Sequence, residues 1–393
     1  MTDGPAPLTA TAEALGLLVP DRTGRSLASV LPAAAAALGV VDDAGRNAAA
    51  QAALGLPSAE RVCVVLVDGL GFDNLSERSG HAPFLRSLLR DDAVITCGFP
   101  STTAVSMGIF GTGSGPGRTG MLGYTVRNPH TGTLANLVSW DGAPEPMDLQ
   151  REPTVFEQLS SAGVRVTSIG PERFAASGMT RAALRGARYW NAESLESRVD
   201  AAAFELMTPG LVYLYWGDVD KVGHHEGSES WQWGDALELA DRELARLQTV
   251  LPPGTQVVVT ADHGMVDVDR ARQRDVAQVA ALHEGVKVVA GEPRAVHLHA
   301  TKRKNAVSLA ERWRDVLGDD ALVATKAEVI EAGWFGEVAE HVEPWIGDVL
   351  VAARGRATVV DSRVQSPRSI ALVGVHGSLT PREMRVPYLT FTV

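Results

Sequence analysis

Carboxylate and imidazole side chains follow four short apolar segments, VCVVLVDG (62–69), LVYLYWGDVD (211–220), QVVVTADHG (256–264) and IALVGVHG (370–377). These groups are Asp68, Asp220, His224, Asp262, His263 and His376. Asp218 competes with Asp220, but only Asp220 has the spacing D-x-x-x-H to His224. Clustered carboxylates repel one another unless cations lie between them. A mixed His and Asp set favours Zn²⁺, with Mn²⁺ as the alternative, so these residues predict a centre for two divalent metal ions.

The segment CGFPSTTAVSMGIFGTG (97–113) offers a nucleophile for such a centre. Ser101, Thr102 and Thr103 follow Pro100 at the point where we expect a helix to begin. The free N–H groups and the positive dipole end of a helix N-terminus suit an anionic phosphoryl group. A threonine oxygen that binds a metal ion loses its proton more easily and can attack phosphorus. The segment therefore indicates phosphoryl chemistry.

The elements that must position these groups are predicted from hydrophobic patterning. Short Val-rich runs are typical of strands buried on both faces of a parallel sheet. Between them, residues 233–251 repeat apolar side chains at helical spacing, and residues 154–163 form a helix that opens with Thr154 and Glu157 as a capping box. This alternation predicts an α/β fold, an open and mostly parallel sheet with helices on both faces. Ligands of such sheets bind at the carboxyl ends of the strands, where the metal-binding residues are expected to meet.

We divide the chain into three parts. Residues 1–59 are Ala-rich and form an N-terminal helical extension, and residues 60–290 with 343–393 form the catalytic core. Residues 291–342 form a small inserted α+β subdomain with helices at 305–318 and 326–336. Its segment AVHLHA (295–300) alternates, which predicts a half-exposed strand with His297 and His299 on the solvated face.

Composition and charge narrow the class of protein. The chain has 36 Lys and Arg against 47 Asp and Glu, a formal net charge of −11, which disfavours a nucleic acid duplex as partner. Two cysteines, Cys63 and Cys97, imply no disulfide framework, and we expect Cys63 to be buried. No apolar run reaches the roughly 18 residues of a membrane span, and the start lacks the pattern of a signal peptide. We therefore expect a cytoplasmic protein with no membrane partner and a small-molecule substrate.

Five motifs in this order, VVLVDGLG, PSTT, D-x-x-x-H, ADHG and VHGSLTP, resemble the alkaline phosphatase superfamily. The nearest branch is that of nucleotide pyrophosphatases/phosphodiesterases, the type I phosphodiesterases, and the resemblance covers about residues 60–270 and 345–393. It implies an alkaline phosphatase-like fold in which Asp68, Asp262, His263 and the nucleophile bind one zinc ion, and Asp220, His224 and His376 bind the other. The family's spacings from Pro100 and to Thr112-Gly113 point to Thr103 as the nucleophile, with Thr102 as the fallback.

The chain departs from the family at one position. Phosphodiesterases of this branch carry an Asn after a G-x-x-G, where this chain has Tyr124 in GMLGY. The Tyr124 hydroxyl or the nearby Asn128 is expected to bind the phosphoryl oxygen instead.

The resemblance implies a two-zinc phosphohydrolase that cleaves a phosphodiester or pyrophosphate bond of a nucleotide-type substrate through a phospho-threonine intermediate. Two alternatives stay open: a phosphomonoesterase or phosphonate hydrolase with the same metal site, and a catalytically silent metal-binding protein. A sulfatase is disfavoured because the chain contains no C-x-P-x-R.

Overall fold

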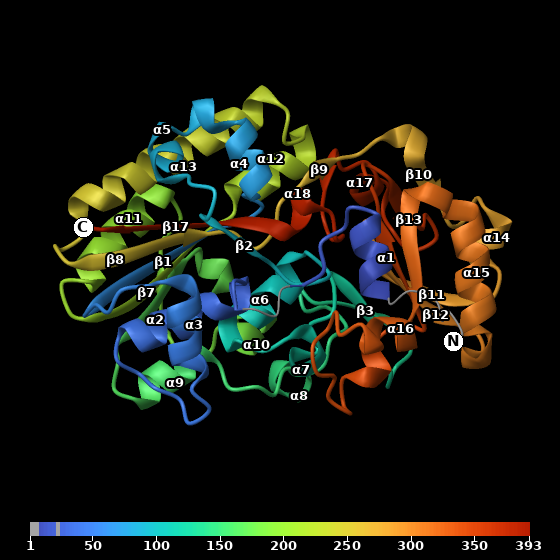
Figure 1. Ribbon diagram of the computed structural model, residues 1–393, viewed down its shortest axis with the longest axis horizontal. Helices are drawn as coiled ribbons and strands as arrows, with labels where there is room; N and C mark the ends of the chain where they lie inside the picture. Colours follow the sequence, from blue (N-terminus) through green and yellow to red (C-terminus); the bar gives the residue numbers. More distant parts are fainter. Residues whose placement is uncertain (1–7, 21–23) are drawn as a thin grey trace.

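The computed structural model describes residues 8–20 and 24–393. A seven-stranded sheet lies at its centre, with the strand order β2-β17-β8-β1-β7-β5-β6 (Figure 1). Strand β17 runs antiparallel to both of its neighbours, β8 and β2, whereas the pairs from β8 to β6 are all parallel. The strands are β1 (Arg61–Val67), β2 (Val94–Thr96), β5 (Val166–Gly170), β6 (Arg188–Asn191), β7 (Gly210–Trp216), β8 (Thr255–Thr260) and β17 (Arg385–Thr392). The prediction of a mostly parallel α/β sheet is confirmed.

Helices cover both faces of this sheet, which explains why β8 and nearly all of β1 and β7 are buried. In Figure 1, α4, α5, α11, α12 and α13 lie above the sheet, and α2, α3, α6, α9 and α10 lie below it. The helices above are α4 (Phe72–Glu77), α5 (Pro83–Leu88), α11 (Leu195–Glu205), α12 (Asp218–Glu226) and α13 (Trp231–Val250). Those below are α2 (Val30–Ala37), α3 (Arg46–Leu54), α6 (Thr103–Thr112), α9 (Val155–Ser161) and α10 (Gly178–Ala183).

Local sequence signals placed several of these elements correctly. Helix α9 begins at the predicted capping box, in which the Thr154 side chain accepts from the Glu157 N–H and the Glu157 carboxylate accepts from the Thr154 N–H. Cys63 is fully buried in β1, as expected. None of the helices in the described ranges combines the length and apolar character that crossing a membrane requires.

The fourth apolar segment, 370–377, is not a strand of the central sheet, so that expectation is wrong. Residues Pro367–Ile370 form α17, and only Gly374–Val375 form a strand, β16, which pairs antiparallel with β9 (Val266–Asp267). The position beside β8 is taken by β17, a longer apolar strand. A side chain at Gly374 would overlap the backbone of Gly223, so glycine lets this segment lie directly against α12.

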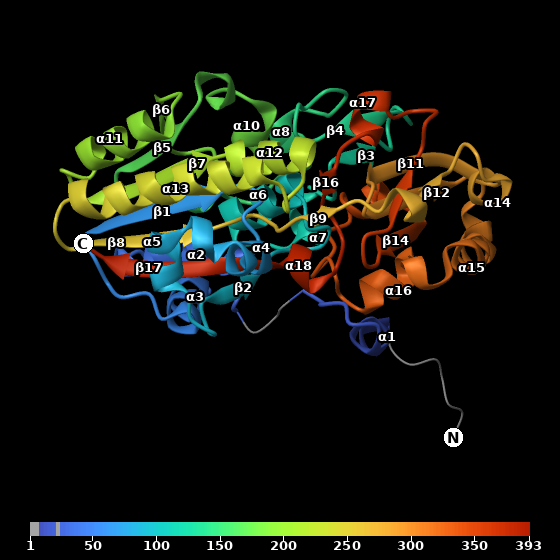
Figure 2. The same ribbon diagram turned by 90° about the horizontal axis from the view of Figure 1, so that it is seen from above.

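A second, antiparallel sheet lies at the far end of the long axis, in the order β11-β12-β14-β13 (Figure 2). Its strands are β11 (Val286–Glu292), β12 (Ala295–Ala300), β13 (Ala321–Thr325) and β14 (Val349–Ala353), accompanied by α14 (Ala280–His283), α15 (Ala306–Leu317) and α16 (Lys326–Glu331). The predicted small α+β insert is therefore present as an antiparallel sheet with helices. The limits 291–342 stay a prediction.

Strand β12 is buried along its whole length, so the half-exposed strand predicted for 295–300 is wrong. One face, with Val296 and Leu298, packs with Trp313 of α15. On the other face His297 and His299 are only 2% and 5% exposed. Alternation of polarity normally marks one solvated face, but here other parts of the chain cover it, and the ring of Phe335 lies 6.1 Å from that of His297.

The remaining described elements are short and connect these layers. They are α1 (Leu8–Ala14), α7 (Pro116–Thr119), α8 (Pro146–Leu149), α18 (Pro381–Met384), β3 (Thr125–Arg127), β4 (Leu134–Asn136), β10 (Gln273–Asp275) and β15 (Thr358–Val360), with short 3-10 turns between them.

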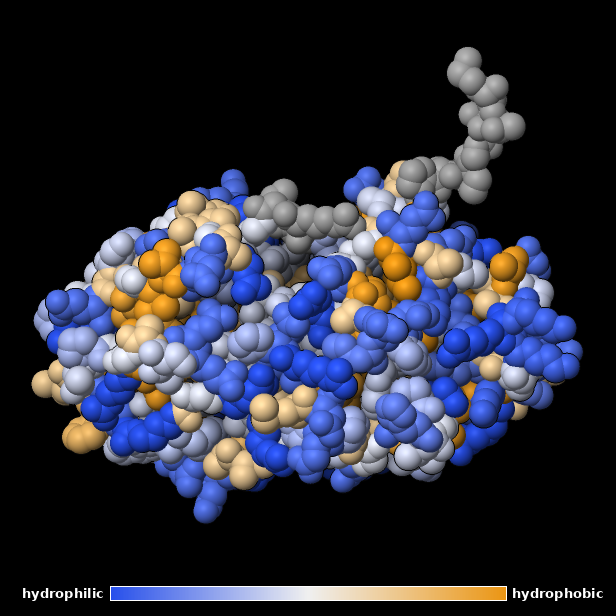
Figure 3. All heavy atoms as spheres, turned by 90° about the horizontal axis from the view of Figure 1, so that it is seen from below, coloured by the Kyte–Doolittle hydropathy of each residue, from blue (hydrophilic) through white to orange (hydrophobic). Residues whose placement is uncertain are grey.

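On the surface of the molecule seen from below, hydrophobic side chains gather in separate small groups among hydrophilic ones (Figure 3).

Candidate metal centre and active site

The carboxyl ends of three adjacent strands bring the first candidate ligands together. Asp68 follows β1 and Asp262 with His263 follows β8, which pairs with β1 in parallel register. The Nε2 atom of His263 lies 3.5 Å from Asp68 Oδ1 and 3.3 Å from Asp262 Oδ2. Asp220 reaches the same place from α12, which follows β7 on the other side of β1.

The ligand atoms form two adjoining groups. In one, donor atoms of Asp68, Asp220 and His263 all lie within 4.8 Å of one another. In the other, the same holds for Asp220, His224 and His376. Asp220 belongs to both groups, which the sequence did not indicate, and Asp218 belongs to neither. The arrangement is that of two neighbouring sites that share a carboxylate.

The three imidazole rings are oriented by backbone carbonyl groups. The Nδ1 atom lies 2.8 Å from Gly374 O in His224, 2.9 Å from Ser101 O in His376 and 3.0 Å from Gly264 O in His263. A carbonyl oxygen can only accept, so Nδ1 carries the proton in each ring and Nε2 keeps a free lone pair. This orientation is typical of histidines that bind metals.

The carboxylates lack the partners that burial demands. Asp68 Oδ1, Asp220 Oδ1 and Asp262 Oδ2 are buried and have no hydrogen-bond partner among the described residues. Burial, together with Asp262 and Asp220, raises the pKa of Asp68 well above its usual value. Burial, His263 and His224 lower the pKa of His376, which favours the neutral ring that a metal needs. These orphaned oxygens and neutral imidazoles fit divalent cations.

Of the three candidate hydroxyls, the structure brings Thr103 to this centre. Thr103 is the first residue of α6, and its Oγ1 lies 3.2 Å from His263 Nε2. Ser101 is fully buried and donates to Ser378 O over 2.6 Å, so its hydroxyl is engaged elsewhere. Thr102 is the N-cap residue of α6 and lines the neighbouring pocket.

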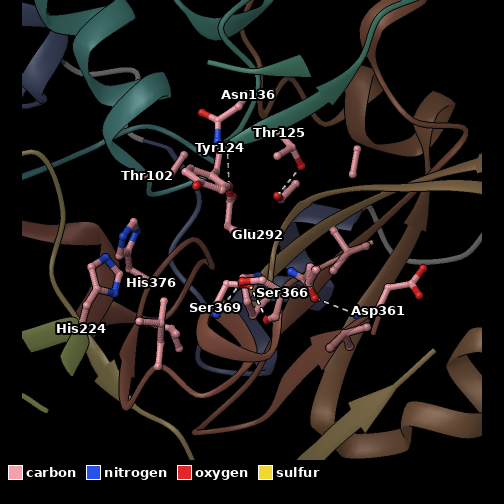
Figure 4. A pocket seen from close by; sticks show the side chains of 18 of the residues that line it. Thr102, Tyr124, Thr125, Asn136, His224, Glu292, Asp361, Ser366, Ser369 and His376 are labelled. Atoms are coloured by element: carbon pink, nitrogen blue, oxygen red, sulfur yellow. Dashed lines mark hydrogen bonds between the residues drawn. The ribbon is translucent and has the colours of Figure 1, made fainter. Parts of the chain in front are cut away.

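A pocket of about 590 Å³ opens beside the ligands Asp220, His224 and His376. Figure 4 shows His224 and His376 at one side of it, with Tyr124, Asn136 and Glu292 nearby. Valines of the small sheet and of the segment before His376 form much of its wall. The pocket therefore combines apolar walls with the metal centre at one end.

The structure places only one of the two predicted substrate-binding residues in this pocket. Tyr124 lines it and is 44% exposed. Asn128 does not line it. Its Oδ1 accepts from the N–H groups of His130 and Thr131, which closes a tight turn.

Two lining residues, Asn136 and Glu292, were missed by the sequence reasoning. Glu292 accepts from the Tyr124 N–H over 2.8 Å, and burial raises the pKa of its carboxyl to about 8. Neither residue stands in a motif, so only their position in space reveals them.

The mixed seven-stranded sheet gives the chain an alkaline phosphatase-like fold, and the His/Asp cluster at its strand ends is a candidate metal site. Residues 62–379 match the family described as type I phosphodiesterase/nucleotide pyrophosphatase. The chain belongs to this family, within the alkaline phosphatase superfamily.

Solved structures share the fold at low sequence identity. Murine ectonucleotide pyrophosphatase/phosphodiesterase 5 superposes with a TM-score of 0.67 at 17% identity, covering 84% of this chain and 87% of that one. Phosphonoacetate hydrolase from Sinorhizobium meliloti 1021, in complex with phosphonoformate, superposes with a TM-score of 0.66 at 20% identity, covering 85% and 91%. At such identities the likeness shows the fold alone.

Curated relatives match over shorter stretches. A phosphopentomutase of Shewanella frigidimarina (strain NCIMB 400) is 29% identical over 181 residues, which is 43% of this chain and 42% of the relative. The mouse ectonucleotide pyrophosphatase/phosphodiesterase family member 7 is 28% identical over 157 residues, which is 37% of this chain and 34% of the relative. The chain spans less than half the length of these curated relatives.

Proposed function

We propose that this protein is a two-zinc phosphohydrolase that cleaves a phosphodiester or pyrophosphate bond of a nucleotide-type substrate. The observation that carries the proposal is the Thr103 hydroxyl at the start of α6, 3.2 Å from His263 Nε2. Asp68, Asp262 and His263 would hold one metal ion together with Thr103, and Asp220, His224 and His376 would hold the other. Bound zinc supplies Lewis-acid stabilisation of the negative charge that develops during phosphoryl transfer.

The reaction follows from the placement of Thr103. Its Oγ1 gives up its proton to solvent, attacks phosphorus and forms the new O–P bond, which leaves a phospho-threonine. The leaving oxygen departs with the electron pair of the broken bond and takes up a proton from solvent. The unpaired N–H groups of the first turn of α6 favour the anionic phosphoryl group. Water then hydrolyses the phospho-threonine, which releases the phosphoryl product and regenerates the Thr103 hydroxyl. The pocket beside His224 has room for an organic group larger than phosphate.

A solved structure with the same fold supports both a catalytic threonine and a nucleotide-type substrate. The murine ectonucleotide pyrophosphatase/phosphodiesterase 5 was solved as an inactive threonine-to-alanine variant in complex with AMP. By analogy, Thr103 is the nucleophile that we propose for this chain.

The second candidate, a phosphonate hydrolase or phosphomonoesterase, is favoured by Tyr124. Tyr124 stands where phosphodiesterases of the branch carry Asn, and the structure keeps Asn128 out of the pocket. A phosphonate-type pocket on this fold is known from the phosphonoacetate hydrolase that superposes on the chain. The two candidates share the metal centre and differ in the group that the pocket accepts.

The test is turnover of p-nitrophenyl thymidine monophosphate beside p-nitrophenyl phosphate by the zinc-loaded protein. Preference for the diester supports the lead proposal. Preference for the monoester contradicts it and supports the second candidate. Bound zinc without hydrolysis of either ester, or of a phosphonate, would leave only a silent metal-binding protein.

The nucleophile is tested by Thr103→Ala. Turnover should fall by roughly a thousandfold or more, because the attacking oxygen is gone, while zinc content persists. Thr249→Ala removes an exposed hydroxyl of α13 and serves as the matched control. Retained turnover in Thr103→Ala, with loss in Thr102→Ala, would move the nucleophile to Thr102.

A further inference from the structure

A buried ion pair joins the small sheet to the loop that carries His376. Arg294, in the turn between β11 and β12, and Glu383, in α18, are both completely buried. Arg294 Nη2 lies 2.6 Å from Glu383 Oε2, and its Nε lies 3.0 Å from Oε1, so the contact is bidentate. The guanidinium also donates over 2.5 Å to the carbonyl oxygen of Ala357, in the segment between β14 and β15.

The same carboxylate holds the loop after His376. The Ser378 N–H donates to Glu383 Oε1 over 2.9 Å, and the Thr380 hydroxyl donates to Oε2 over 2.5 Å. Each carboxylate oxygen of Glu383 thus accepts one hydrogen bond from Arg294 and one from the loop after His376. Because an ionised carboxylate is an acceptor for about four hydrogen bonds, its capacity is filled by these groups alone.

Ser101 carries the connection to the metal centre. Its N–H donates to Gly377 O over 2.9 Å, and its hydroxyl donates to Ser378 O over 2.6 Å. Its carbonyl oxygen, in turn, faces His376 Nδ1 at 2.9 Å and so orients that ring. A displacement of Ser378 would therefore move both the His376 ring and the segment that leads into Thr103.

We propose that Arg294 and Glu383 are positioning residues through which the small sheet sets the affinity of the metal site that contains His376. The inference rests on the proposed function only in that the His/Asp centre binds metal. A buried ion pair adds little stability compared with an apolar pair of similar volume, so a positional effect can be separated from a general loss of stability. Groups that orient a metal-binding histidine typically change metal affinity by about 10- to 100-fold.

The experiment uses Arg294→Met and the double variant Arg294→Met with Glu383→Leu. The single variant leaves a buried carboxylate without its cation and should unfold at a lower temperature than the wild type. The double variant removes both charges and should recover part of that loss in the zinc-free protein, because the Ser378 N–H still loses its acceptor. Zinc binding, titrated against a competing chelator, should nevertheless show one site weakened about tenfold or more in the double variant.

Arg165→Met is the matched control. Arg165 pairs with the buried carboxylate of Glu205, on α11, a pair that makes no contact with the His376 loop. This variant should bind both zinc ions with wild-type affinity. A general effect of removing a cation from a buried carboxylate would weaken zinc binding in the control as well, and that result would overturn the proposal.

Two further outcomes decide against the proposal. It is overturned if the double variant binds both zinc ions as the wild type does, or if both sites weaken equally. If the double variant fails to fold, the zinc affinities of Arg294→Lys test the proposal instead. Lysine keeps the positive charge but loses the bidentate contact with Glu383. We expect Arg294→Lys to bind zinc more weakly at one site. If both of its sites bind zinc as tightly as in the wild type, the proposal is again overturned.

Failure of this inference differs from failure of the proposed function. Zinc binding without hydrolysis in the wild type would remove the proposed reaction and leave the positioning test intact. Hydrolysis by the wild type, with unchanged zinc affinities in the variants, would remove only the positioning role.

Discussion

The candidate active site brings carboxylates that repel one another next to His376, whose lowered pKa favours the neutral ring. Asp68 illustrates the balance, since burial and the neighbouring Asp262 and Asp220 raise its pKa, whereas the Tyr215 hydroxyl, 2.5 Å from Asp68 Oδ2, lowers it. A cation among these oxygens removes the reason for the carboxyl to keep a proton. The same residues are therefore unfavourable as a metal-free cluster and favourable as a metal site.

This balance predicts that zinc binding releases protons. With its pKa raised, Asp68 holds a proton above the usual range of an aspartate, and the incoming cation expels it, so zinc affinity should rise with pH. Calorimetric titration at one pH in two buffers of different ionisation enthalpy measures the release. Enthalpies that do not depend on the buffer would contradict the prediction.

Tyr215→Phe sharpens that test. It removes the hydrogen bond that stabilises the ionised form of Asp68 and keeps the ring. The variant should release more protons on zinc binding and bind zinc more weakly at pH 6 than the wild type. Tyr189→Phe, which removes a hydroxyl bonded to the Pro171 carbonyl, is the control and should behave as the wild type.

At the scale of elements, helix α6, which presents Thr103 to the centre, packs very closely on α10. A β-carbon on Gly111 would overlap the carbonyl oxygen of Ala183, the last residue of α10. Glycine is intrinsically unfavourable inside a helix, so close approach is the reason for it here.

Gly111→Ala should therefore destabilise the protein. Alanine gains about 1 kcal/mol in helix propensity, but forcing α6 and α10 apart costs about 1–3 kcal/mol and moves the start of α6. Urea unfolding measures the net loss, and turnover measures the displacement of Thr103. In Gly80→Ala the new methyl group meets open space, so this control should stay near wild-type stability. Gly111→Ala with raised stability would contradict the packing argument.

At the scale of the whole molecule, the small sheet carries two buried histidines, His297 and His299. His297 accepts from the Gly347 N–H at Nδ1, and burial lowers the pKa of His297 to about 4. Burial, followed by the charge of His297, lowers the pKa of His299 to about 3. Both rings are neutral in the folded protein near pH 7, and protonation of His297 at Nδ1 would break its hydrogen bond.

Acid should therefore unfold the protein through these histidines. The unfolded chain binds protons near pH 6.5, whereas the folded protein binds them only near pH 4 or below, so stability is full above pH 6.5 and falls as the pH drops. Between pH 6.5 and 5 each histidine should cost about 2 kcal/mol. Urea midpoints at the two pH values test this, and His299→Gln should reduce the loss. An equal loss in that variant would exclude His299 as a cause.

Residue types and local patterns determined much of this protein. Val-rich runs that end in Asp68, Asp220 and Asp262 place the three carboxylates at one sheet edge, because parallel strands end together. The capping box of Thr154 and the helix at 233–251 are also local, since hydrogen bonds and apolar contacts within a helix link residues three or four apart.

Only the tertiary structure decided what depends on distant contacts. His376 reaches the centre from a short strand beside α12, because its segment pairs with β9 outside the central sheet, in which it was expected to be a strand. The histidines of β12 are buried because other chain segments cover a face whose pattern reads as exposed. Asn136 and Glu292 line the pocket while Asn128 does not, since the walls of a cavity are set by where segments cross in space, and sequence spacing carries no information about that.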